Sequence, residues 1–509
     1  MLLFLFSLSV SLNIKTCLPP ECSIVTIEQP LDHFGSTNET FYQNYTIIDK
    51  FWPENSTTSN VILYLGHTIN VETEEIDKLP VFELANYSKA ILIVVQQRFF
   101  GDSTLDPYDS KINKFLTIDQ CVEDLANIAR SISWKPCSGN QSITVVGAGL
   151  MGTIGSIFKL KYSSLVNFSW ISSPILNFKK TAFELDFFLG TQINRRDPVC
   201  FNNSLNLFDI ISNYQNSSKE YNDFITNIGV DESRNFGSAI YVLQDFYYYL
   251  LTENQDMLGK YCRSLNTSES KVDSLITYVK NWKKTKNYSP NQMDPMIKTW
   301  KTQSQKSKLF MQCNEIGLFN VTGFFLPSDL DTDYYQEVCM NMFNIDISKK
   351  SINIMSRDLY GASNIKTTNS IYTSCDLDPF VNLTVGITDY SIQKLHYYIA
   401  HNGISCDMRP AAITDGDDLN LMKPLIMQKI SNWMHGYCAK NCNSENGHCL
   451  LHTCVCKPGF HGYNCEKNDK DMIVRFDAFI TFLIVLPTFI LGAAGVGAWI
   501  VFTKEKMMP

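Results

Sequence analysis

Residues 142–152, SITVVGAGLMG, determine how the rest of this chain is interpreted. The first five are mostly apolar and β-branched, which predicts a short buried strand, and residues 153–162 predict a helix. A glycine-rich turn with Gly149 at its centre joins the two. Strand, sharp turn and helix in this order are typical of a nucleophile elbow, whose central side chain stands above the sheet. Gly149 can adopt the backbone angles of such a turn, but it supplies no hydroxyl.

The same glycines match a second pattern, the dinucleotide-binding fingerprint G-x-G-x-x-G. That motif requires an acidic residue about 20 positions further on, where it holds a ribose. The next acidic residue after Gly152 is Glu184, which lies too far along the chain. We therefore expect no dinucleotide and no other cofactor.

Residues 147–162, GAGLMGTIGSIFKLKY, align without a gap on a block with the pattern G-G-S-Y-G-G-M-L-A-A-W-F-R-x-K-Y. In this block the chain resembles the prolyl carboxypeptidase and dipeptidyl-peptidase II family of serine peptidases. Residues 171–174, ISSP, are similar to the family segment A-S-S-A-P. The resemblance places Gly149 on the nucleophilic serine and Leu150 on a residue that contributes an oxyanion-hole amide. It implies a serine-peptidase fold whose nucleophile has been lost.

Further blocks upstream support the resemblance. Residues 28–34, EQPLDHF, and 96–103, QQRFFGDS, are similar to the family's Q-x-L-D-H-F and E-H-R-Y-Y-G-E-S. Between them we predict an edge hairpin and strands at 60–65 and 90–95, followed by an amphipathic helix at 115–132. Strands alternating with helices predict a mainly parallel sheet covered on both faces, as in an α/β-hydrolase.

His67 follows the strand at 60–65, where an α/β-hydrolase usually places its other oxyanion-hole amide. The family pattern in this loop is G-x-E-G, and the sequence around His67 departs from it. The oxyanion contacts implied for His67 and Leu150 therefore depend on a loop that has changed.

The triad acid is implied by residues 373–380, TSCDLDPF, which resemble the family's N-G-x-L-D-P-W and place Asp378 on the acid. Without the resemblance, Asp-Pro would predict only a turn. An acid after a late strand is where such folds hold the group that orients the histidine.

The triad histidine has no counterpart. Residues 403–409, GISCDMR, resemble the family's G-A-H-H-L-D-L-R, and the histidine pair becomes Ile404 and Ser405. His401 lies three residues before Ile404, and His396 lies further upstream. A shift of the loop that carries His401 is the alternative left open by the sequence.

A helical cap is implied for residues 177–364, which have helical periodicity and the position of the family's cap insertion. The aromatic run at 246–249 could line a substrate groove, but four aromatic residues in a helix more often pack a core. The predicted order is a signal peptide at 1–12, α/β-hydrolase parts at 13–176 and 365–435, the cap between them, an EGF-like module at 438–466, a transmembrane helix at 478–502 and a tail at 503–509. A helix from Pro424 to Met434 is predicted to close the second α/β-hydrolase part.

Six cysteines near the C-terminus have the spacing C-x3-C-x6-C-x4-C-x-C-x8-C, which resembles an EGF-like module. The resemblance implies the pairs Cys438–Cys449, Cys442–Cys454 and Cys456–Cys465. A zinc site is the competing interpretation, and an oxidising compartment disfavours it. We expect no metal. The pairing of the ten upstream cysteines, Cys17 to Cys406, cannot be predicted.

The chain is predicted to be a type I membrane glycoprotein with its large domain lumenal or extracellular. Residues 1–12 are apolar and too short to span a bilayer, whereas residues 478–502 are uncharged and long enough. Asn-x-Ser/Thr sequons lie upstream of the apolar segment, and the sequon at Asn167 is expected to be too close to the core for use. The expected glycosylation sites are Asn38, Asn44, Asn55, Asn86, Asn140, Asn202, Asn216, Asn266, Asn287, Asn320 and Asn382.

The net charge of −8 argues against a nucleic-acid partner, which is usually met by a basic face. Ala493 and Gly497 have the small-xxx-small spacing that can pair membrane helices, so a homodimer is one open expectation.

Three functions fit these observations. The first is a membrane-anchored, inactive peptidase-like protein that acts as a binding or adhesion module for peptides or a surface protein. The second is an active serine-type carboxypeptidase or dipeptidyl peptidase cleaving near proline through an unaligned nucleophile. The third is a purely structural surface glycoprotein. Loss of the serine and the histidine favours the first, because removing either one abolishes most triad catalysis.

Overall fold

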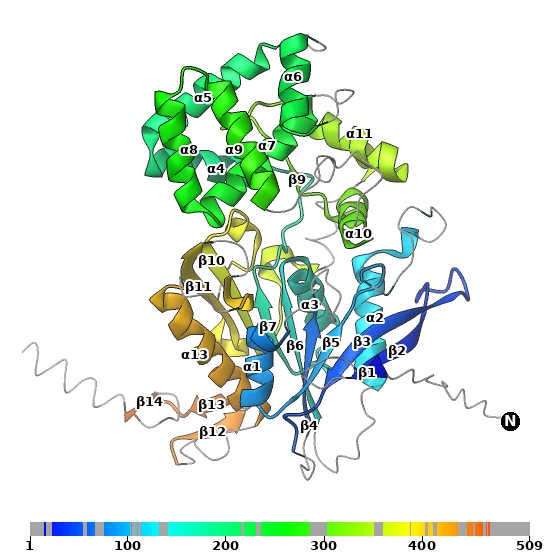
Figure 1. The fold of residues 1–509 in the computed structure, drawn as a ribbon. Coiled ribbons are helices and arrows are strands. Elements are labelled where there is room, and N and C mark those ends of the chain that lie inside the picture. The colour runs from blue at the N-terminus through cyan, green and yellow to red at the C-terminus, as the bar shows by residue number, and fades with distance from the viewer. Residues whose placement is uncertain are drawn as a thin grey trace, which may run out of the picture. The chain divides into compact units, whose positions relative to one another are not determined.

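A nine-stranded sheet, in the order β1-β2-β3-β5-β4-β6-β7-β10-β11, forms the centre of residues 1–430 in the computed structural model (Figure 1). The strands are β1 Lys15–Thr16, β2 Ser23–Pro30, β3 Thr40–Ile48, β4 Ser59–Leu65, β5 Ile91–Val95, β6 Gln141–Ala148, β7 Phe168–Ser172, β10 Ser370–Leu377 and β11 Lys394–Asn402.

The structure describes part of the chain, and everything below refers to that part. It comprises residues 15–16, 23–53, 59–66, 76–101, 103, 109, 113–131, 141–214, 218–230, 236–285, 303–350, 360–386, 388–402, 406–410, 415–435, 445–450, 453–461, 465 and 467–468.

Six strands, in the order β5-β4-β6-β7-β10-β11, pair in parallel, as predicted. Strands β1, β2 and β3 add an antiparallel edge next to β5. All five residues of β5 are buried, because helices cover both faces of the sheet. The predicted edge hairpin is confirmed: β2 and β3 pair from Ser23 to Pro30, and β3 then pairs with β5.

Four helices flank the sheet: α1 Pro80–Tyr87, α2 Ile118–Ser131, α3 Gly149–Lys161 and α13 Asp417–Met434. The connection from β4 to β5 runs in the opposite direction to those from β5 to β6 and from β6 to β7. Since crossovers are right-handed, α1 lies on one face, and α2 and α3 pack together on the other.

The segment after β7 is helical, with α4 Glu184–Arg196, α5 Pro198–Ser212, α6 Lys219–Asn227, α7 Phe236–Thr252, α8 Gln255–Thr267, α9 Lys271–Thr285, α10 Gln303–Met311 and α11 Thr332–Phe343 (Figure 1). A parallel pair, β8 Thr181–Ala182 with β9 Phe319–Asn320, joins its two ends. We call residues 181–343 the cap. It belongs to the same compact unit as the sheet, so the predicted boundaries at 177 and 364 stay a prediction.

The aromatic run in α7 packs the cap rather than lining a groove. Phe246 and Tyr247 are fully buried, and the Tyr247 hydroxyl lies 2.6 Å from that of Tyr261. Burial raises the pKa of Tyr247 to about 12, so both hydroxyls stay protonated.

Two helices begin earlier than the sequence suggested. Helix α3 begins at Gly149 itself rather than at residue 153, because β6 leads directly into it. Helix α13 begins at Asp417 and includes Pro424, which we expected at its start. Asp417 and Asp418 suit its first turn, where negative charge is favoured, and the exposed Pro424 is accommodated within the helix.

Short helical turns complete residues 1–430: η1 Ile76–Lys78, η2 Asn113–Phe115, the π-turn η3 Gln312–Ile316, η4 Ile347–Lys349, η5 Ala362–Asn364, η6 Val381–Leu383, η7 Tyr390–Ile392 and η8 Cys406–Met408. Three disulfides pair cysteines that the sequence left unassigned: Cys200–Cys262, Cys313–Cys339 and Cys375–Cys406. Cys121 is a buried free thiol.

Residues 431–509 form a second unit with the short strands β12 Gly447–Leu450, β13 Thr453–Cys456, β14 Phe460–His461 and β15 Lys467–Asn468. The Cys456–Cys465 disulfide is present, in agreement with the implied pairing. The other two pairs involve Cys438 and Cys442, which lie outside the described residues, so the EGF-like module stays a prediction.

None of the described helices is both long and apolar enough to cross a bilayer. The predicted signal peptide at 1–12, the transmembrane segment at 478–502 and the tail at 503–509 lie outside the residues that the structure describes.

Candidate functional site

The elbow has the predicted geometry without a nucleophile. Gly149 has φ +55°, between β6, which ends at Ala148, and the first turn of α3. A side chain at this left-handed angle is strained, and such strain is found at functional sites. Ser156 cannot replace the missing hydroxyl, since it is fully buried and donates a hydrogen bond to the Gly152 carbonyl at 2.8 Å.

The glycines around the elbow are required by close backbone packing. A Cβ on Gly147 would lie 2.8 Å from the Met151 carbonyl oxygen, and one on Gly152 would lie 3.1 Å from the Ser172 carbonyl oxygen. These contacts hold α3 tightly against the ends of β6 and β7. The turn is therefore built as in an elbow that carries a reactive residue.

Leu150 lies in the first turn of α3, where backbone N–H groups have no acceptor within the helix. That position is suited to an oxyanion-hole amide, as the resemblance implied. His67, the other predicted contributor, lies outside the described residues, and the preceding Gly66 donates its N–H to the Val95 carbonyl oxygen at 3.2 Å.

Asp378 lies just beyond β10 and is only 3% exposed. Its carboxylate accepts the Phe380 N–H at 2.8 Å and a hydrogen bond from the Ser173 hydroxyl. Burial nevertheless raises the pKa of Asp378 to about 6, because these hydrogen bonds only partly replace water. The carboxyl is thus held in place without a cation or imidazolium among its described hydrogen-bond partners.

Ile404 and Ser405, the predicted histidine positions, lie outside the described residues, but the chain immediately after them is firmly anchored. The Cys375–Cys406 disulfide ties it to β10, the strand that leads to Asp378. The fully buried Asp407 accepts hydrogen bonds from Trp170 Nε1 at 2.9 Å, Ser172 Oγ at 2.5 Å and Thr373 Oγ1 at 2.6 Å. This anchoring places Asp407 beside the end of β7 and the middle of β10.

The two upstream histidines differ in position. His396 pairs with Tyr372 near the start of β11, and its Nε2 lies 2.9 Å from Ser374 Oγ. Ser374 lies four positions before Asp378, and the ring has Ser374 rather than Asp378 as its hydrogen-bond partner. Burial lowers the pKa of His396 to about 4, so the ring stays neutral. His401 lies near the end of β11, where Asn402 pairs with Leu377, and its side chain is outside the described part.

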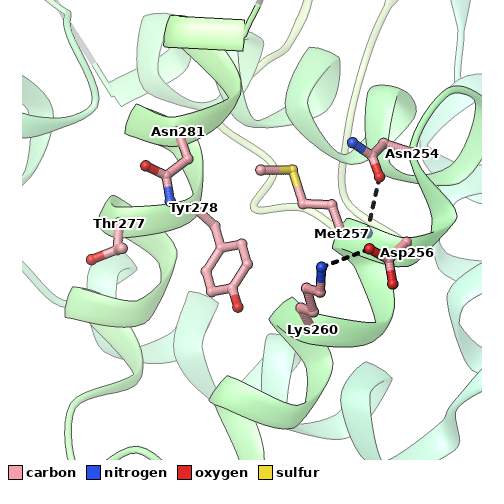
Figure 2. A pocket seen from close by; sticks show the side chains of 7 residues that line it. All are labelled: Asn254, Asp256, Met257, Lys260, Thr277, Tyr278 and Asn281. Atoms are coloured by element: carbon pink, nitrogen blue, oxygen red, sulfur yellow. Dashed lines mark hydrogen bonds and ion pairs between the residues drawn. The ribbon is translucent and has the colours of Figure 1, made fainter.

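A cavity of about 360 Å³ lies elsewhere, on the cap between α8 and α9 (Figure 2). Three of its polar side chains are already engaged, since Asn254 caps α8 through the Met257 N–H and Lys260 pairs with Asp256. It contains no nucleophile–base pair, so we do not connect it with hydrolysis. It is lined by Asn254, Asp256, Met257, Lys260, Thr277, Tyr278 and Asn281.

Two groups of described residues have the side chains to hold a metal: Asp197 with Cys200 and Cys262, and Cys375 with Cys406 and Asp407. In both groups the two cysteines are bonded to each other, so they offer no thiolate.

Sequence reasoning missed Ser173 and Asp407 as parts of the site. Ser173 has φ +45° and contacts Asp378, and the motif ISSP contained no signal that this serine was strained. Asp407 was used only to align the Asp-Met-Arg segment. Its position directly after the histidine block was the available signal for a positioning role.

The parallel sheet, the elbow between β6 and α3, the acid after β10 and the inserted helical segment together define an α/β-hydrolase. The family model described as "Serine carboxypeptidase S28" matches residues 29–426, so this chain belongs to that family of serine peptidases.

Curated relatives agree with this assignment. The chain is 22% identical over 453 residues to the lysosomal Pro-X carboxypeptidase of Homo sapiens, covering 82% of this chain and 89% of the relative. It is 23% identical over 466 residues to a putative serine protease of Caenorhabditis elegans, covering 79% and 82%.

Among solved structures, the proline iminopeptidase of Mycobacterium smegmatis is similar with a TM-score of 0.35 and 10% identity, covering 81% of this chain and 97% of that one. A peroxisomal α/β-hydrolase of Saccharomyces cerevisiae has a TM-score of 0.34 and 10% identity, covering 92% and 97%. We draw no conclusion from either likeness.

Proposed function

We propose that this protein is a catalytically inactive, membrane-anchored member of its peptidase family that acts as a binding or adhesion module. The observation that carries the proposal is Gly149, which has the backbone angle of a nucleophile elbow but no oxygen. In subtilisin, removing the nucleophile or the base alone costs about 10⁶-fold in rate. Here the aligned position of each lacks the required side chain.

The parts of the site that remain in place support a binding function. Asp378 is still buried just beyond β10, and Asp407 still anchors the segment after Ile404 and Ser405. Such a frame can hold a peptide or a surface protein segment, because clefts of this fold are formed by loops at the carboxyl ends of the strands.

The alternative is an active serine-type exopeptidase acting near proline. The names of the relatives, lysosomal Pro-X carboxypeptidases, favour it. It would require a nucleophile outside the elbow and His401 as the base. A purely structural glycoprotein is the remaining alternative, and it would bind no peptide.

The unmodified protein is expected not to react with a fluorophosphonate probe, because Gly149 has no hydroxyl to phosphonylate. It should not release C-terminal residues or dipeptides from proline-containing peptides above the uncatalysed rate. Probe labelling mapped to one serine, and abolished by its replacement with alanine, would establish the exopeptidase instead.

The proposed location is an endolysosomal or cell-surface membrane, with the large domain lumenal or extracellular. The lysosomal names of the relatives support it. So do the exposed side chains of the sequon residues Asn38, Asn86, Asn202, Asn266 and Asn382.

Protease added to intact cells or sealed right-side-out vesicles is expected to digest the glycosylated domain and to leave a tag placed after Pro509 intact. The reason is the apolar run at 478–502, which is long enough to span the bilayer once. A protected large domain combined with a digested tag would mean the opposite orientation.

A further inference from the structure

Glu315 joins two parts of the molecule that are far apart in sequence. It lies in the π-turn η3, between α10 and β9, and is 3% exposed. Its Oε2 accepts the N–H of Ile118, the first residue of α2, at 2.8 Å and across 197 positions of the chain. The returning limb of the cap, residues 303–320, is thereby attached to a helix that covers the sheet.

The limb is held so that Glu315 must face α2. Ser307 donates its hydroxyl to the Phe99 carbonyl oxygen at 2.6 Å, and both residues are fully buried. The Cys313–Cys339 disulfide fixes the π-turn to α11. Single π-turns of this kind occur often at functional sites, and here the turn presents one acidic side chain to the start of a helix.

Charged groups surround this contact from several elements. Asp119, next to Ile118 on α2, repels an ionised Glu315, whereas Lys350 and Lys161 attract it. Asp119 Oδ1 itself accepts the Tyr360 hydroxyl at 3.1 Å and pairs with Lys161 Nζ.

The remaining titratable neighbour is the buried Cys121 thiol on α2, and burial together with nearby acids raises its pKa far above neutrality. It therefore stays uncharged and does not offset the charge of Glu315. Burial is the dominant influence on Glu315, and it raises the pKa of that carboxyl to about 7.

We propose that Glu315 is a proton-operated clasp, which fastens the returning limb of the cap to α2 while its carboxyl is neutral and loosens that limb when the carboxyl ionises. A neutral carboxyl still accepts the Ile118 N–H through its carbonyl oxygen and avoids a buried charge beside Asp119. The clasp does not depend on whether the elbow is catalytic.

The direction of this pH dependence follows from the raised pKa of Glu315 in the closed form. The closed form binds a proton more tightly than an opened, hydrated Glu315 does. Closure is therefore favoured most at acidic pH and is lost as the pH rises through about 7. The returning limb is thus held most tightly to α2 under acidic conditions and less tightly at neutrality.

Hydrogen exchange on the full-length protein tests the clasp at about pH 5 and about pH 7.5, after correction for the intrinsic pH dependence of exchange. In the natural protein, amides at the start of α2 and in residues 312–318 should exchange faster at the higher pH. The expected increase is about tenfold for each unit by which closed and open pKa values differ. Glu315→Gln should remove the difference, and the exposed Glu269→Gln should leave it unchanged.

A second variant covers the case in which Glu315→Gln does not fold. Asp119→Asn removes the negative charge that repels an ionised Glu315, so the pH at the midpoint of the loosening should be lower in this variant than in the unmodified protein.

An upward movement of that midpoint is the result that would overturn the clasp. The clasp requires a downward movement, because loss of the Asp119 charge lowers the pKa of the closed-form Glu315 carboxyl and makes its ionisation less costly. The pH-dependent change in exchange should also become smaller in Asp119→Asn. Equal exchange at both pH values in the natural protein, or an unchanged pH dependence in Glu315→Gln, would also overturn the proposal.

Discussion

Replacing Asp124 with asparagine is expected to destabilise the protein by about 3–5 kcal/mol, since it leaves a buried cation without its counter-charge. Arg98 is fully buried, and its Nε and Nη2 donate to the two Asp124 carboxylate oxygens, both at 2.7 Å. His33 Nε2 lies 2.7 Å from the same carboxylate. Arg98 lies in the turn after β5, Asp124 lies in α2, and His33 lies in the turn after β2. The variant therefore weakens the junction of these three segments.

Thermal unfolding of the full-length protein measures this effect. Asp256→Asn is the matched control, because Asp256 pairs with Lys260 on the exposed surface of α8 and should contribute very little. A double variant, Arg98→Met with Asp124→Leu, should recover part of the loss, since it removes both buried charges. Equal unfolding temperatures for Asp124→Asn and Asp256→Asn would contradict the prediction.

The central sheet was predictable because its signals are local. The apolar runs of β4, β5 and β6 and the alternation of strands with helices indicated a parallel sheet before any contact was known. The elbow was predictable for the same reason, since glycines at fixed spacing between a strand and a helix leave few other backbone geometries. The left-handed angle of Gly149 agrees with that prediction.

Contacts between distant segments were not predictable. Nothing near Glu315 in sequence indicates that it meets Ile118, and the disulfides described among residues 1–430 could not be paired from spacing alone. The start of α13 was missed because Pro424 was taken as a helix boundary, although seven helical residues precede it. The contact, the disulfide pairs and the start of α13 each depend on tertiary packing that the local sequence does not reveal.

Restoring the nucleophile alone is expected to recover almost no peptidase activity. Gly149→Ser would place a hydroxyl at the elbow, at a left-handed angle that costs on the order of 1–3 kcal/mol in an L-residue. A serine without a base to take its proton is a poor nucleophile. Its fluorophosphonate labelling and its cleavage of proline-containing peptides should stay close to those of the natural protein.

Adding a base is the step with the large expected effect. In Gly149→Ser with Ile404→His, the imidazole would enter just before Cys406, which is bonded to Cys375, three positions before Asp378. Asp378 is already buried and would gain the partner that it lacks, so its pKa should fall from about 6. Gly149→Ser with Ser405→His tests the neighbouring register.

The double variants should exceed Gly149→Ser by orders of magnitude in probe labelling, because serine and base act as one unit and their effects do not add. Gly149→Ala with Ile404→His is the matched control: it has the same imidazole and a similar backbone but no hydroxyl, so it should remain unlabelled. Full recovery is not expected, since the sequence around His67 departs from the family pattern at an oxyanion contact. If neither double variant exceeds Gly149→Ser while all remain folded, the register that places Ile404 or Ser405 beside Asp378 is wrong.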